Sequence, residues 1–159
     1  MDKAQIRDAI LAQLESELAL QVEAALTSKD EATNEENKAE DKYDMRSQSA
    51  AYLAAGQAKM ASEIADAIQA YRNLPLLKAD PSSPIAAGDL VTLSAKGLPS
   101  YYFVGPNRGG MEVLAEGESI TVVTGGSPLG RQLVGRRVGE QVTLPSRPVP
   151  IEFQIAAVR

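Results

Sequence analysis

The chain has 159 residues, of which 44% are hydrophobic and 4% aromatic, and its formal net charge is −5. It contains no cysteine and no histidine, which excludes disulfides, zinc sites of the usual Cys/His kind, thiol nucleophiles and Ser-His triads. No apolar run reaches the ~18 residues of a membrane span, and the N-terminal residues lack a signal-peptide pattern. We therefore expect a cytoplasmic protein that does not enter a membrane.

The negative charge is concentrated in the first half of the chain. Residues 1–74 hold 14 acids and 8 bases, whereas residues 75–159 hold 7 acids and 8 bases. Within residues 30–44 there are seven acids and two bases. Phosphate backbones are bound by clustered Lys and Arg, so we expect no nucleic-acid binding by the whole surface and no sequence-specific DNA binding.

Two long helices are predicted, over residues 2–32 and 43–74. Both have apolar residues seven apart, at Ala4, Leu11, Leu18 and Ala25 in the first and at Leu53, Met60, Ala67 and Leu74 in the second. This spacing is typical of a coiled coil, and the short connection predicts an antiparallel hairpin in which Leu18 faces Leu53–Met60. Gln21 and Gln57 interrupt the two seams and are expected to fix the register of the hairpin.

The connection near residues 32–42 forms an acidic tip. Its carboxylates, with those beside it, are Asp30, Glu31, Glu35, Glu36, Glu40, Asp41 and Asp44. Such oxygens are suitable ligands for Mg²⁺ where a partner supplies the rest of the shell. In the alternative interpretation the tip is a solvated turn whose acids cap the second helix, through Thr33 with Glu36 or Asn37 with Glu40.

The second half of the chain predicts a small α+β domain. Residues 75–88 contain three prolines and form a linker, so the predicted domains are residues 1–74 and 89–159. Ser127-Pro128 is a helix start. If this helix simply covers one end of a sheet, Leu129, Leu133 and Val134 are core and Arg131, Arg136 and Arg137 are in solvent, and we expect this at least of the two leucines. Turn-bounded strands are predicted over residues 89–94, 100–104, 111–115, 119–124, 141–144 and 151–158.

The segment from Ser127 to Val142 resembles the short helix and turn of the C-terminal domain of bacterial Gre transcript-cleavage factors. The closest matches are Ser127-Pro128-Leu129-Gly130, Leu133-Val134-Gly135, Val138-Gly139-Glu140-Gln141-Val142 and Pro150-Ile151-Glu152-Phe153-Gln154-Ile155. The hairpin with its acidic tip resembles the other half of such a factor. The resemblance implies an α+β protein with an N-terminal antiparallel hairpin and a small FKBP-like β-rich domain with one short helix.

The resemblance also implies a function. A Gre-like factor binds bacterial RNA polymerase, inserts its hairpin into the secondary channel and modulates transcription elongation, with indirect contact to the nascent RNA. It is not itself an enzyme and has no cofactor of its own, because the polymerase active site cleaves the backtracked RNA. The acidic tip (Glu35, Glu36, Glu40, Asp41, Asp44) would act there, with Glu36, Glu40 and Asp41 sharing a Mg²⁺. The surface formed by Ser127, Pro128, Leu129, Gly130 and Arg131 would dock on the polymerase.

At the tip the chain departs from the cleavage-competent pattern of the family. Those factors have Asp and Glu separated by two residues, whereas residues 28–48 contain no such pair and only Asp41 and Asp44 have the spacing. A non-cleaving inhibitor acting through the same channel is therefore an alternative, and a coiled-coil interaction protein is another. A peptidyl-prolyl isomerase would need an aromatic pocket, for which the chain has only two Phe and no Trp.

Overall fold

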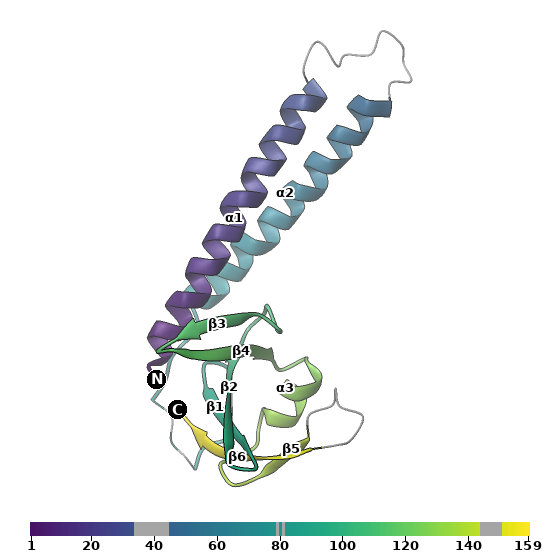
Figure 1. Cartoon of the computed structure of the whole chain (residues 1–159). Helices are drawn as coiled ribbons and strands as arrows, with labels where there is room; N and C mark the ends of the chain where they lie inside the picture. Colours follow the sequence, from purple (N-terminus) through teal and green to yellow (C-terminus); the bar gives the residue numbers. More distant parts are fainter. Residues whose placement is uncertain (34–44, 79, 81, 144–150) are drawn as a thin grey trace. The chain divides into compact units, whose positions relative to one another are not determined.

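The computed structural model describes residues 1–33, 45–78, 80, 82–143 and 151–159 (Figure 1). The chain forms two compact units. One is Ala12–Gln69, and the other combines Met1–Leu11 with Ala70–Arg159. The first unit is a helical hairpin, and the second is a β domain that also includes the first residues of the chain. No helix of the described residues is both long and apolar enough to cross a membrane.

Two helices account for most of the first half of the chain. Helix α1 spans Lys3–Thr33 and helix α2 spans Met45–Arg72, so both predicted helices are confirmed to within two residues at each end. Along the hairpin the two helices run antiparallel, as Figure 1 shows. Helix α2 ends shortly before Pro75, and the amide of Leu74 donates to the carbonyl of Tyr71 at 3.2 Å. A helix commonly ends just before proline, because the residue preceding proline disfavours the helical conformation.

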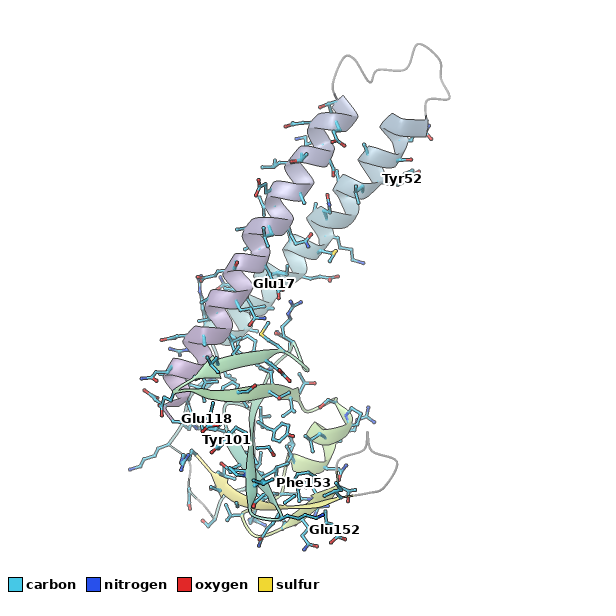
Figure 2. The ribbon with its side chains drawn as sticks, viewed as in Figure 1. Glu17, Tyr52, Tyr101, Glu118, Glu152 and Phe153 are labelled. Atoms are coloured by element: carbon cyan, nitrogen blue, oxygen red, sulfur yellow. The ribbon has the colours of Figure 1, made fainter. Side chains whose placement is uncertain are left out.

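The hairpin seam consists mainly of alanine. The half-buried side chains between residues 20 and 65 are Gln21, Ala24, Ala25, Ala50, Ala54, Gln57, Ala61 and Ala65. The predicted seam residues Leu53 and Met60 are instead 54% and 50% exposed, so this part of the heptad prediction was wrong. Small side chains at helical spacing let two backbones approach closely, and the larger residues beside them then point outward. Tyr52 on α2, 80% exposed, projects away from α1 (Figure 2).

A polar pair links the two arms. Ser28 is 5% exposed, and its hydroxyl donates to Oε1 of Gln57 at 2.9 Å. Gln57 therefore contacts the opposite arm, and the role of Gln21 and Gln57 in fixing the register stays a prediction. Because the arms are antiparallel, the residue ten before Ser28, which is Leu18, lies level with the residue ten after Gln57, which is Ala67. The predicted pairing of Leu18 with Leu53–Met60 was wrong.

A single six-stranded sheet organises the β domain. Its strands are β1 (Leu90–Ala95), β2 (Leu98–Gly105), β3 (Glu112–Ala115), β4 (Glu118–Thr124), β5 (Gln141–Thr143) and β6 (Glu152–Val158). The order across the sheet is β3-β4-β2-β1-β6-β5. All neighbours are antiparallel except β2 and β4, which pair in parallel. All six predicted strands are present, so the predicted fold class is confirmed.

One face of the sheet packs against the short helix α3 (Pro128–Leu133). The core on this face contains Ile85, Val91, Leu93, Val104, Val123, Leu129, Leu133, Val142, Phe153, Ile155 and Val158. Successive residues of a strand point to opposite faces, so Phe153 and Ile155 are buried while Glu152 and Gln154 are exposed. Figure 2 shows Phe153 directed into the domain and Glu152 directed outward.

The opposite face is covered in part by Tyr71. In the strand register Leu90 lies beside Phe103, and Phe103 lies beside Val122, and all three side chains are buried. Tyr71 is fully buried in the same unit, and its hydroxyl donates to the carbonyl of Asn107 at 2.7 Å. A Cβ at Gly105 would collide with that hydroxyl, so the close approach requires glycine there.

Tyr71 gives the protein a specific sensitivity to alkaline pH. Burial raises the pKa of its phenol from 10.0 to about 12, with the charge of Arg108 acting in the opposite direction. The Tyr71 phenol therefore ionises at a lower pH in the unfolded chain than in the folded protein. Its contribution to the free energy of unfolding is complete below pH 10.0 and is lost as pH rises toward about 12.

Tyr71→Phe should cost about 1 kcal/mol at neutral pH through the lost hydrogen bond. The wild type should lose its advantage above pH 10.0 and become the less stable protein at strongly alkaline pH, because about two pKa units outweigh one hydrogen bond, as measured by urea unfolding. A constant difference would contradict this account.

Candidate functional site

The acidic tip lies outside the described residues. Glu35, Glu36, Glu40, Asp41 and Asp44 all fall within residues 34–44, so their predicted roles, including a shared Mg²⁺, stay predictions. At the edge of this segment Asp30 and Glu31 are exposed on the last turns of α1. Among the residues that the structure does describe, no group of three acids is placed to hold a metal ion.

Thr33 belongs to the first arm of the hairpin. It is the last residue of α1, and its hydroxyl donates to the carbonyl of Lys29 at 3.0 Å. Such a bond to the preceding turn is typical of threonine inside a helix. The capping box that began at Thr33 was therefore wrong, and the one that began at Asn37 lies outside the described residues.

The start of α3 is held by Ser127. Its hydroxyl accepts a hydrogen bond from the amide of Gly130 at 3.0 Å and donates to the carbonyl of Thr124 at 2.8 Å. Pro128 follows as the first helical residue, where a missing N–H has no cost. The predicted helix start is confirmed, and Ser127 joins the end of β4 to the beginning of α3.

The five residues predicted to dock on a polymerase divide into two groups. Ser127 and Gly130 form the cap, and Leu129 is 8% exposed in the core. Pro128 and Arg131 are exposed, and Nε of Arg131 donates to the carbonyl of Gly126 at 2.9 Å. Of the five side chains, those two can meet a partner directly.

Exposed valines lie just beyond Arg131. Val134 and Val138 are 44% and 37% exposed, so the assignment of Val134 to the core was wrong, whereas Leu129 and Leu133 are buried as predicted. Val134 is the C-cap of α3, and its backbone is extended (φ −60°, ψ 128°), so its side chain no longer continues the buried face of the helix. The pattern of α3 could not show this, because Val134 follows the helical repeat but lies one residue after the helix ends.

Two arginines lie between these valines in the sequence. Arg136 pairs with Glu140 at 3.2 Å and also donates to the carbonyl of Gln132 at 2.9 Å. Nε of Arg137 donates to the carbonyl of Ser82 at 2.9 Å. We call Arg131, Val134, Arg136, Arg137 and Val138 the α3 patch. Exposed valines and arginines follow one another along this segment, a composition that suits a partner surface with apolar and acidic groups.

Two carboxyl groups of the β-domain unit have lowered pKa values because they accept hydrogen bonds from backbone amides. The backbone amide of Ser82, and then its hydroxyl, hold the pKa of Asp80 below its usual value. The backbone amide of Asp2 does the same for Glu116, which lies in the turn between β3 and β4. Both groups are exposed and hold backbone in place, so neither is a candidate for acid–base chemistry.

The structure defines the class of this protein as an acidic helical hairpin joined to a six-stranded α+β domain. Three solved structures of a Gre-factor homologue, Gfh1, are similar to it. The GreA factor homologue 1 of Thermus thermophilus is 19% identical, with 94% of each chain covered and a TM-score of 0.39. A second Gfh1 structure is 21% identical, covering 94% of this chain and 93% of that one, with a TM-score of 0.41. Thermus aquaticus Gfh1 is 21% identical, with 92% of each chain covered and a TM-score of 0.39. No protein family model and no curated protein matches the chain.

Proposed function

We propose that this protein binds bacterial RNA polymerase and modulates transcription elongation by placing its hairpin in the secondary channel. The α3 patch docks on the outside of the polymerase, and the acidic tip acts near the polymerase active site. The protein is a regulator, and any RNA cleavage is performed by the polymerase. Stimulation of that cleavage and inhibition without cleavage are the two modes of action that the tip sequence leaves open.

The observation that supports this proposal most strongly is the agreement of two separate regions with the Gre-like pattern. The segment that resembles the family's C-terminal helix forms α3, with Ser127 as its cap and Pro128 at its start. The acidic half of the chain forms two antiparallel helices, α1 and α2, joined by the acidic segment. A general coiled-coil interaction protein would require the hairpin but neither α3 nor an acidic connection.

The proposal is tested with reconstituted transcription complexes. Purified protein should bind core RNA polymerase in a direct titration and change the behaviour of complexes that have been backtracked by nucleotide omission. Shortening of the RNA identifies cleavage stimulation, and slower elongation with intact RNA identifies inhibition. Absence of binding to the polymerase would overturn the proposal in both modes.

A matched pair of variants separates docking from folding. Arg131→Ala removes an exposed cation, so it should weaken polymerase binding while leaving the thermal midpoint nearly unchanged. Lys96→Ala, at an exposed turn between β1 and β2, removes the same charge elsewhere on the domain and should leave binding intact. Equal affinities for the two variants would contradict docking through the α3 patch.

A further inference from the structure

A shallow, open apolar groove runs along one face of α1, within the hairpin unit. It is lined by Leu18, Val22 and Leu26, which are four residues apart and therefore share one face of the helix. Val22 and Leu26 are 43% and 56% exposed. Together with the half-buried Leu18 they form a contiguous apolar stripe, and exposed apolar patches commonly mark interaction sites.

Carboxylates line the same groove. Glu15, Glu23 and Asp30 border the apolar stripe along its length, and all three are exposed. This charge restricts what can occupy the groove. A phosphate backbone would meet like charge along the whole stripe, so nucleic acid is disfavoured. A second copy of the hairpin pairing through the same face would bring these acids together, and like charges in close contact are unfavourable.

We propose that this groove, defined by Leu18, Val22, Leu26, Glu15, Glu23 and Asp30, binds a protein segment whose apolar residues are flanked by Lys and Arg. The identification of that segment as part of RNA polymerase rests on the proposed function. The apolar stripe supplies affinity through burial, and the acids select a basic partner and set the salt dependence of binding. The groove thus specifies which side of the hairpin contacts the polymerase.

The apolar part of the inference is tested with the full chain carrying Val22→Ala and Leu26→Ala together. Alanine favours helix, so the hairpin should keep its stability while the stripe is lost. Binding to core RNA polymerase should weaken by about tenfold or more, which is ~1.4 kcal/mol. Leu20→Ala is the matched control, because Leu20 is 64% exposed on the same helix and does not line the groove. Equal affinity of the groove variant and the control would overturn the inference.

The acidic part is tested by neutralising the rim. Glu23→Gln with Asp30→Asn should weaken binding several-fold at low salt and flatten the dependence of affinity on ionic strength. Glu63→Gln with Asp66→Asn, two exposed acids of α2, makes the same change in net charge away from the groove. Identical salt dependence in the two variants would show that overall charge, and not the groove, attracts the partner.

A second probe separates this inference from the proposed function. A synthetic amphipathic helix of leucine and lysine should bind the wild-type chain and should lose affinity for the Val22→Ala, Leu26→Ala variant but not for Leu20→Ala. If this peptide binds in that pattern but the polymerase does not, the proposed function fails and the groove stands. If the polymerase binds but neither partner distinguishes the variants, the groove fails and the proposed function stands. Preferential binding of single-stranded RNA to the groove would also overturn the inference.

Discussion

Replacement of Gly130 by alanine should strongly destabilise the β domain. A Cβ at Gly130 would overlap the carbonyl oxygen of Thr124 and would lie 2.6 Å from the carbonyl carbon. It would also lie 2.9 Å from the hydroxyl of Ser127, which caps α3. Backbone cannot yield as a flexible side chain does, so we expect a loss of about 3 kcal/mol or more. The measurement is urea unfolding followed by circular dichroism.

Gly126→Ala is the control for that substitution. Its added Cβ would meet no atom within 4 Å, and its backbone is not among the positive-φ glycines, so the stability should change little. Gly126 lies between β4 and α3, only four residues before Gly130, which is within α3. A Gly130→Ala protein with wild-type stability would contradict the packing of α3 against the end of β4.

Neutralising the acidic tip should abolish the effect of the protein on transcription. The variant changes Glu35, Glu36 and Glu40 to Gln and Asp41 to Asn, which keeps the side-chain size and removes four negative charges. Under the proposed function these carboxylates act at the polymerase active site, whereas docking depends on the α3 patch. RNA shortening or slowed elongation should therefore disappear while affinity for the polymerase falls only slightly. The hairpin seam and the core of the β domain lie outside this segment, so the fold should be retained.

The control makes the same change in charge at four exposed acids elsewhere: Glu63, Asp66, Glu118 and Glu152. This control should keep the wild-type effect on transcription. If the wild type shortens backtracked RNA and the tip variant does not, the tip carboxylates take part in cleavage. If the wild type only slows elongation, their charge is inhibitory. An unchanged effect in the tip variant would favour the alternative interpretation, in which the tip is a solvated turn.

Much of the candidate site followed from local sequence. The cap at Ser127 and the burial of Leu129 and Leu133 depend on residues within one or two helical turns of each other. Such short-range patterns can be predicted from the sequence alone. The exposure of Val134 was not predictable, because it depends on the helix ending at Leu133, one residue earlier. The groove on α1 was missed for a related reason. A stripe of Leu18, Val22 and Leu26 fits a buried helix face as well as an exposed one.

The sequence by itself determined the elements of this protein: two long helices, six strands and α3, because helical and strand periodicities are local properties of the chain. Only the tertiary structure decided which residues of the hairpin meet. Heptad spacing predicted Leu53 and Met60 in the seam. In the structure the seam consists of alanines together with the hydrogen-bonded Ser28 and Gln57, and Leu53 and Met60 are exposed. The parallel pairing of β2 with β4 was likewise decided by contacts between distant residues. Local sequence periodicity predicts that a face of a helix or strand is apolar, but tertiary packing determines which residues cover that face.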